Sequence, residues 1–231
     1  MHIILMGPQG SGKGTQSERV RARLSLVTIA TGELFRAAIK GGSALGLRIQ
    51  AIYDRGELAP DDLTVALVEE RLDSLAHSVS DEGRASGALY DGFPRTEGQA
   101  DALDRALRAR GAEVTAVIAI DVPRDQLIRR LAGRRVCSKC GHVYNVEFDP
   151  PRVLGICDVC GGSVEQRADD TPEAVAKRLD LYELETAPLV ARYEERGLVT
   201  HVDGDQPIDA VTDSIVAAIR AKSAVAASRG H

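Results

Sequence analysis

The sequence contains no tryptophan, and aromatic residues make up only 3% of its 231 residues. It has no apolar run near the roughly 20 residues that a membrane-spanning helix needs. Its N-terminus has neither the basic stretch nor the apolar segment of a secretory signal. These absences predict a cytoplasmic protein that does not act in a membrane, and the length is sufficient for a sizeable core.

Basic residues are also fewer than acidic residues. The sequence has 29 lysines and arginines and 34 aspartates and glutamates, which gives a formal net charge of -5. Proteins that bind nucleic acids present broad positive surfaces to the phosphate backbone, and single-strand binders add stacking aromatic rings. We therefore expect no nucleic-acid partner. The sequence shows no heptad or long exposed apolar helix, so a monomer is expected.

Short apolar runs alternate with longer helical patterns along the chain. Strands are expected at residues 2–6, 26–30, 88–93, 115–122 and 198–203, and helices at 13–24, 61–77, 96–110, 123–132, 172–196 and 207–222. Runs that are apolar throughout are typical of strands buried on both faces of a parallel sheet. The alternation predicts an α/β fold in which a parallel five-stranded sheet is wrapped by helices.

Two segments interrupt this alternation. Residues 31–60 carry two short helical patterns and no strand signal, which predicts a small helical insertion. Residues 133–170 contain all four cysteines, a proline pair and a glycine pair, which predicts a second compact excursion. The core domain is then expected to comprise residues 1–30, 61–132 and 171–231.

The stretch GPQGSGKGT, residues 7–15, joins the first expected strand to the first expected helix. A strand, a glycine-rich loop and a helix together direct backbone N–H groups and the positive helix end toward one anion. Gly10, Gly12 and Gly14 have no Cβ to obstruct a phosphate, and Lys13 can reach its oxygens. The loop therefore predicts a nucleotide polyphosphate site. We interpret Thr15 either as a residue that positions magnesium or as an ordinary first-turn residue.

The cysteines form two pairs, VCSKCG and ICDVCG, separated by sixteen residues. Two such pairs on tight turns can surround zinc as a tetrahedron, and four protein ligands leave no position for substrate. We therefore predict a structural metal, zinc or another divalent ion, held by Cys137, Cys140, Cys157 and Cys160. Disulfides are the alternative, but a cytoplasmic location disfavours them. An iron–sulfur cluster could also use four thiolates, although the paired spacing favours zinc.

Five motifs, taken in order, resemble those of adenylate kinases: GPQGSGKGT, TGELFR at 31–36, DGFPRT at 91–96, GRR at 133–135, and RADD at 167–170 followed by Arg178. The resemblance covers nearly the whole chain and is to the long-lid bacterial form. It implies a P-loop kinase fold that catalyses reversible, magnesium-dependent phosphoryl transfer, ATP + AMP = 2 ADP. Residues 31–60 would be the AMP-binding insertion, and residues 133–170 a zinc-ribbon-like lid.

The resemblance also implies roles for single residues. The implied ATP-binding residues are Gly10, Gly12, Lys13, Gly14, Thr15, Arg130 and Arg134. The implied AMP-binding residues are Thr31, Gly32, Arg36, Gly92, Arg95, Gln99, Arg167 and Arg178. The implied catalytic residues are Lys13, Arg95, Arg130, Arg134, Arg167 and Arg178.

Several of these residues have a different interpretation without the resemblance. Each arginine would be taken as a solvated surface residue, Thr31 as a helix cap and Gln99 as a surface residue. Asp91 is either a turn residue or a residue that holds magnesium indirectly; we favour magnesium, because the ends of parallel strands face the ligand crevice. Asp170 is expected to be solvated.

Other functions remain open at this point. A kinase of UMP, CMP or GMP would share the phosphate apparatus, although a long lid favours AMP. A nucleotide-regulated binding protein or a simple ATPase would also use the glycine loop. Phosphoryl transfer needs no protein nucleophile, which agrees with the lack of an evident Ser-His-Asp set. It does need water to be excluded, so we expect the two insertions to close over the substrates.

Overall fold

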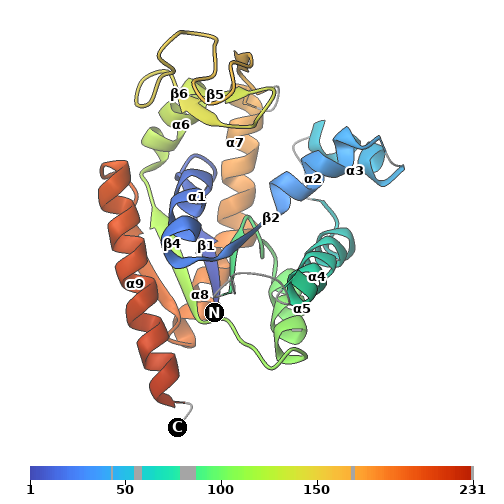
Figure 1. Cartoon of the computed structure of the whole chain (residues 1–231), viewed down its shortest axis with the longest axis vertical. Helices are drawn as coiled ribbons and strands as arrows, with labels where there is room; N and C mark the ends of the chain where they lie inside the picture. The colour runs from blue at the N-terminus through green and yellow to red at the C-terminus, as the bar shows by residue number, and fades with distance from the viewer. Residues whose placement is uncertain (43, 55–58, 79–86, 168–169, 230–231) are drawn as a thin grey trace.

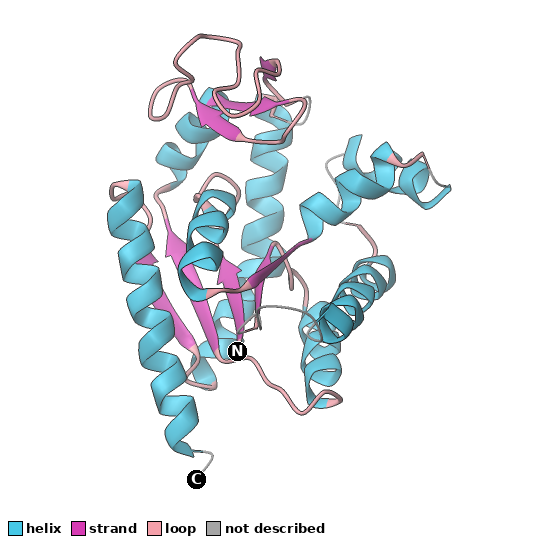
Figure 2. Cartoon of the chain, viewed as in Figure 1, coloured by secondary structure: helices cyan, strands magenta, loops and turns pink. Residues whose placement is uncertain are grey.

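The structure is a computed structural model that describes residues 1–42, 44–54, 59–78, 87–167 and 170–229. Its central sheet has five parallel strands in the order β2-β3-β1-β4-β8 (Figure 2). The strand bounds are β1 His2–Met6, β2 Val27–Ala30, β3 Ala88–Asp91, β4 Ala116–Asp121 and β8 Val199–Asp203. The predicted α/β fold with a parallel five-stranded sheet is confirmed.

Helices pack on both faces of this sheet (Figure 1). The helices of the described chain are α1 Lys13–Leu24, α2 Thr31–Lys40, α3 Ala44–Asp54, α4 Asp61–Ser78, α5 Glu97–Arg108, α6 Arg124–Gly133, α7 Pro172–Leu181, α8 Ala187–Glu195 and α9 Ile208–Arg229, of which α2 and α3 lie away from the sheet faces. Among the described residues, none of these helices is both long and apolar enough to cross a membrane.

Strand β1 shows why the strands are apolar throughout. Ile3 and Leu5 point to one face, where they join a core cluster with residues of α1 and α9. Ile4 and Met6 point to the other face and pack with residues of α4, α5 and α8. Since all four side chains are at most 2% exposed, neither face of the strand can carry polar residues.

Several predicted elements end differently from expectation, and α9 continues to Arg229 rather than residue 222. Strand β3 stops at Asp91 rather than residue 93, because Gly92 has φ +74° and turns the chain into the left-handed region. The predicted helix 172–196 is divided by a π-helical turn, η1 Tyr182–Thr186, between α7 and α8. Pro188 lacks an N–H group and its ring excludes the carbonyl one turn back, so a regular helix cannot continue through it.

The two excursions lie beyond the same end of the sheet. Helices α2 and α3 project to the side of the sheet and pack on each other around Phe35 and Ile49 (Figure 1). Helices α6 and α7 carry a small antiparallel sheet in the order β6-β5-β7. Its bounds are β5 Arg134–Cys137, β6 Val143–Asn145 and β7 Val164–Glu165. Both excursions therefore border the carboxyl ends of the parallel strands.

Candidate active site and metal centre

One large cleft, with a volume of about 1670 Å³, lies at the carboxyl ends of the parallel strands. Its walls come from the core, from the α2–α3 insertion and from the small antiparallel sheet. The cleft brings together every residue predicted to contact nucleotide or magnesium. These are Gly10, Gly12, Lys13, Gly14, Thr15, Thr31, Gly32, Arg36, Asp91, Gly92, Arg95, Gln99, Arg130, Arg134, Arg167 and Arg178.

The glycine-rich loop connects β1 to α1 at the floor of this cleft. Gly12 precedes the first helical residue with φ +93°, a left-handed conformation that glycine adopts without a steric penalty. A Cβ on Gly7 would lie 2.8 Å from the carbonyl oxygen of Ile120, so the loop also packs too closely for a side chain. The first turn of α1 has no acidic residue, which leaves its positive end available to an anion.

Lys13 is held by the carbonyl groups of its own loop. Its Nζ donates hydrogen bonds to the backbone oxygens of Gly7 at 2.6 Å and Pro8 at 2.8 Å. Burial lowers the pKa of the Lys13 ammonium to about 8; Asp91 opposes this shift, whereas Arg95 and Arg134 add to it. The surroundings of Lys13 therefore destabilise its charged form, and a bound anion such as phosphate would stabilise it.

Asp91 lies beside the start of α1. A Cβ on Gly14 would approach its Oδ2 to 3.8 Å, so the carboxylate lies close to the phosphate loop. Thr15 is half-buried in the first turn of α1 and also lines the cleft. Carboxylate and hydroxyl oxygens are of the type that magnesium prefers, directly or through water. These two residues fit a magnesium site next to the loop.

Two of the predicted ATP-binding arginines contact protein groups. Arg134 donates from Nε to Oδ2 of Asp170 at 2.7 Å and forms a second bond to Oδ1 from Nη2. The expectation that Asp170 is solvated is wrong, because it is only 2% exposed and a buried carboxylate requires such a partner. Arg130 donates from Nη2 to the Gly204 carbonyl at 3.0 Å and to Asp205 at 3.1 Å.

The other predicted arginines line the cleft from three directions. Arg36 is exposed on α2, and Arg167 and Arg178 are half-buried near the small sheet and on α7. Arg95 donates from Nε to the carbonyl of Gly92 at 2.9 Å. The middle two residues of the RADD motif, 168 and 169, lie outside the described residues.

Thr31 and Gln99 are both buried, each with 2% exposure. Thr31 does not cap α2, because Ala30 occupies the cap position and the Thr31 hydroxyl donates to the Gly92 carbonyl at 2.9 Å. Gln99 is not a surface residue, since its carboxamide is hydrogen-bonded on both sides. The interpretations of these residues made without the family resemblance are therefore wrong.

Three residues around Gln99 were missed by the sequence analysis: Asp61, Thr96 and Thr186. Asp61 and Thr96 are linked through their side chains, and Thr186 donates to the carbonyl of Arg95 at 3.0 Å. A signal was present for one of them, because TEGQ at 96–99 has the spacing of a capping box. Thr96 does cap α5, accepting a hydrogen bond from the Gln99 N–H.

A family model described as adenylate kinase matches residues 5–198 of the chain. The chain belongs to the adenylate kinase family. It is 47% identical over 220 residues to the adenylate kinase of Carboxydothermus hydrogenoformans, covering 95% of this chain and 100% of the relative. It is 50% identical over 211 residues to that of Moorella thermoacetica, covering 91% and 94%.

A third adenylate kinase, from Symbiobacterium thermophilum, is 48% identical over 221 residues, covering 96% of this chain and 99% of the relative. The predicted family is thereby confirmed, and with it an enzyme of the nucleoside monophosphate kinase type that catalyses ATP + AMP = 2 ADP. This result disfavours a nucleotide-regulated binding protein and a simple ATPase as the function of the glycine loop.

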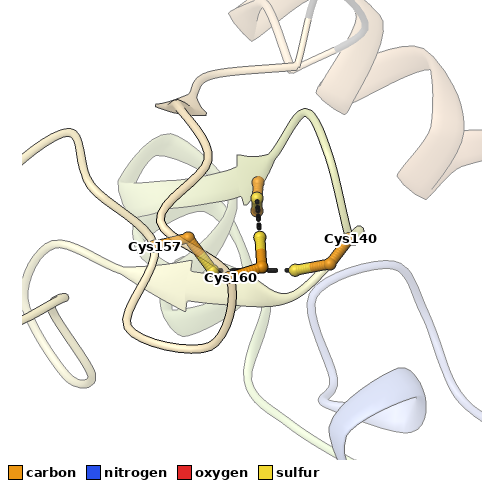
Figure 3. A group of neighbouring side chains, drawn as sticks. Cys140, Cys157 and Cys160 are labelled. Carbon is orange, nitrogen blue, oxygen red and sulfur yellow. Dashed lines mark hydrogen bonds between the residues drawn. The ribbon is translucent and has the colours of Figure 1, made fainter.

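The segment around the small antiparallel sheet of this adenylate kinase carries the four cysteines, and their sulfur atoms all lie within 4.8 Å of one another. Cys137 and Cys160 have Sγ atoms 3.5 Å apart, and Cys140 and Cys157 have Sγ atoms 3.6 Å apart. Zinc–sulfur bonds of about 2.3 Å place tetrahedral sulfurs roughly 3.8 Å apart, whereas a disulfide needs about 2.05 Å. The cysteines are free thiols, and their arrangement fits a four-coordinate metal (Figure 3).

Residues next to the cysteines form hydrogen bonds that favour the thiolate form needed to bind a metal. The Tyr144 hydroxyl accepts a hydrogen bond from the Asp158 N–H at 2.8 Å and lies 3.4 Å from the Cys157 sulfur. Burial alone would raise the pKa of Cys157, but hydrogen bonds from Tyr144 and from backbone N–H groups lower it to about 6. Such contacts around ligand atoms favour the thiolate and fix its position.

The pKa of Lys13 predicts that ATP binding weakens as pH rises. Below pH 8 most Lys13 side chains carry a proton in the free enzyme, whereas above pH 8 a proton must be taken up to bind polyphosphate. We expect the dissociation constant for MgATP to rise between pH 8 and 9.5, approaching about tenfold per pH unit. Calorimetry in buffers of different ionisation enthalpy should detect proton uptake at pH 8.5.

Lys13→Arg provides the control for this titration, because its guanidinium stays protonated throughout the range. The variant should show no proton uptake on binding MgATP at pH 8.5, whatever its affinity. An unchanged affinity of the wild-type enzyme between pH 7.5 and 9.5 would contradict the assignment of Lys13 to the phosphates.

Proposed function

We propose that this chain transfers the γ-phosphoryl group of ATP directly to AMP within the single cleft described above. The observation that supports this proposal is the gathering of the phosphate loop, Lys13 and six predicted arginines around one space. Two polyanions repel each other, so the chain's main contribution is to hold them in line and to neutralise their charge.

We propose distinct roles for the two sides of the cleft. Residues 10 and 12–15 of the loop bind the ATP phosphates, together with Arg130 and Arg134. The AMP side consists of Thr31, Gly32, Arg36, Gly92, Arg95, Gln99, Arg167 and Arg178. The acceptor is a phosphate oxygen that is already ionised near neutral pH, so no residue need act as a general base.

Lys13 and the arginines at positions 95, 130, 134, 167 and 178 are the proposed catalytic residues. Their fixed positive charges stabilise the charge that accumulates on the transferring group. Magnesium supplies further charge neutralisation when it is bound with ATP, and Asp91 and Thr15 would hold it beside the loop. Asp170 keeps the Arg134 guanidinium at the cleft until phosphates offer it alternative acceptors.

We further propose three parts with the predicted boundaries: a rigid core and two moving segments, the insertion at residues 31–60 and the lid at residues 133–170. Closure of the last two would exclude water, which otherwise competes with AMP as acceptor. Zinc is the proposed metal of the lid, because four thiolates with tetrahedral spacing suit it. A cytoplasmic location, a monomeric state and the lack of nucleic-acid or membrane partners stay predictions.

The test is a turnover assay on purified protein whose metal content has been measured. With MgATP and AMP, we expect two molecules of ADP for each AMP consumed and little phosphate release when AMP is omitted. UMP, CMP and GMP should be poor acceptors. Phosphate release that does not depend on AMP would instead indicate an ATPase, and preferred use of another monophosphate would reassign the base pocket.

A further inference from the structure

The carboxamide of Gln99 is held in a single orientation. Its Oε1 accepts a hydrogen bond from the backbone N–H of Arg95 at 2.8 Å, and its Nε2 donates to Oδ1 of Asp61 at 2.8 Å. The residue is 2% exposed yet borders the cleft. A carboxamide offers two N–H groups and two oxygen lone pairs, so one donor and one acceptor remain for a ligand.

Asp61 is itself fixed by its surroundings. Its Oδ2 accepts a hydrogen bond from the Thr96 hydroxyl at 2.7 Å. A Cβ on Gly98 would lie 2.8 Å from the same oxygen, so the carboxylate fits against the first turn of α5 only because that position is glycine. Asp61 is also in the first turn of α4. The carboxylate thus lies near two positive helix ends.

An ionised carboxylate can only accept hydrogen bonds, and a backbone N–H can only donate. The NH₂ group of Gln99 must therefore face Asp61, and its oxygen must face Arg95. Rotating the carboxamide by half a turn would place oxygen against carboxylate and NH₂ against N–H. The backbone of Arg95 is also held through the next peptide group, because its carbonyl accepts the hydrogen bond from Thr186.

A fixed carboxamide distinguishes purines by the order of donor and acceptor on the base edge. Adenine presents an amino donor beside the N1 acceptor, whereas 6-oxopurines present a carbonyl acceptor beside an N1–H donor. A carboxamide can pair with either edge, but only in opposite orientations, and good bidentate pairs of this kind discriminate between bases. Because the enzyme's acceptor is AMP, the orientation found here is the one that must suit adenine.

We propose that Asp61 is a positioning residue that locks the Gln99 carboxamide and thereby makes the monophosphate site selective for adenine over 6-oxopurines. This inference rests on the proposed function, in which Gln99 contacts AMP. Asp61 need not touch the substrate; it excludes the alternative orientation of the residue that does.

Asp61→Asn tests the inference, because an asparagine can donate or accept and so removes the constraint that Asp61 places on Gln99, while the Arg95 N–H keeps its own. The measurement is the ratio of kcat/KM for AMP to kcat/KM for inosine monophosphate, which differs from AMP only at the N1 and C6 positions. We expect this ratio to fall about tenfold in D61N, the order of one bidentate pair, with the KM for ATP unchanged.

The neighbouring Asp62→Asn is the matched control, since it removes the same charge from an exposed position in the same helical turn. D62N should keep the wild-type ratio. Both specificity constants scale equally with the fraction of active enzyme, so partial unfolding cannot change their ratio. If D61N does not fold, Asp61→Ser, which can also donate or accept, replaces it.

Gln99→Ala separates failure of this inference from failure of the proposed function. If Q99A loses discrimination and D61N retains it, the lock by Asp61 is wrong while the role of Gln99 stands. If Q99A retains discrimination, Gln99 does not read the base, and both its proposed AMP-binding role and the Asp61 lock are overturned, while phosphoryl transfer to AMP stands. An equal loss of activity toward both monophosphates in D61N would show a purely structural role and would also overturn the inference.

Discussion

Replacing Lys13 with alanine is expected to reduce ATP + AMP turnover by about 100-fold or more while the chain stays folded. The Nζ atom donates hydrogen bonds to two backbone carbonyls of the loop, which phosphate oxygens would replace as partners. Removal of one group that stabilises developing negative charge typically costs about 10²–10³ in rate. A coupled assay for ADP formation at saturating MgATP and AMP measures the effect.

The same substitution should leave the thermal midpoint of unfolding close to that of the wild type. Burial lowers the pKa of Lys13 to about 8, which means that the folded chain disfavours this charge. Its removal therefore relieves an unfavourable charge at the cost of two hydrogen bonds to loop carbonyls, those of the buried Gly7 and the half-buried Pro8. A large loss of turnover with an unchanged thermal midpoint would show that Lys13 acts in catalysis and not in stabilising the fold.

Lys222→Ala is the matched control, because this lysine also donates to a backbone carbonyl, that of Gly197, but at an exposed position on α9. It should retain turnover within about twofold, as expected for a surface substitution. Lys13→Met adds a second comparison, since it keeps the unbranched stem and removes the charge alone. If the turnover of K13A stayed within tenfold of that of the wild type, the proposed ATP site would be contradicted.

The features that the sequence predicted are those encoded by neighbouring residues. The five strands are recognisable because each is buried on both faces and must be apolar at every position, as Ile3 to Met6 illustrate. The metal site depends on two short cysteine pairs whose turns are set by adjacent glycines. In both cases the physical cause lies within a few residues, so the pattern can be recognised in the sequence without knowledge of the fold.

The errors arose where a contact joins distant parts of the chain. Asp170 is buried because Arg134, 36 residues away, forms two hydrogen bonds to it. Gln99 is buried because Asp61, 38 residues away, accepts from its carboxamide. A charged or polar residue in isolation is usually solvated, and nothing in its immediate neighbours indicates the partner. The π-helical turn before Pro188 was missed for a different reason, because helical periodicity continues through it.

Loss of the lid metal should unfold the lid without unfolding the core. The buried cluster of the lid consists of Cys137, Tyr144, Cys157 and Val164, so two of its four members are also proposed metal ligands. Apolar residues such as Leu154 and Val159 remain 79% and 65% exposed and add little burial. A core this small cannot hold a fold alone, whereas structural zinc sites supply about 10 kcal/mol or more in small domains.

Cys140→Ser with Cys160→Ser is the variant of choice, because these two cysteines are less buried than Cys137 and Cys157. The double substitution removes two ligands and leaves the buried pair in place. We expect less than one tenth of the wild-type metal content, rapid amide exchange across residues 134–167 and at least about tenfold lower turnover. Turnover falls because Arg134 and Arg167 lie at the ends of the segment that loses its order.

His142→Ala is the control, since His142 is near the cluster but is not needed to complete four ligands. It should keep one metal per chain and slow exchange in the lid. Exchange in β1 and β4 should stay slow in every variant, because the two core clusters share no residue with the lid cluster. If the metal-free double variant kept slow exchange in the lid, the thiols and Tyr144 would suffice to hold it, and the metal could not be what stabilises this segment.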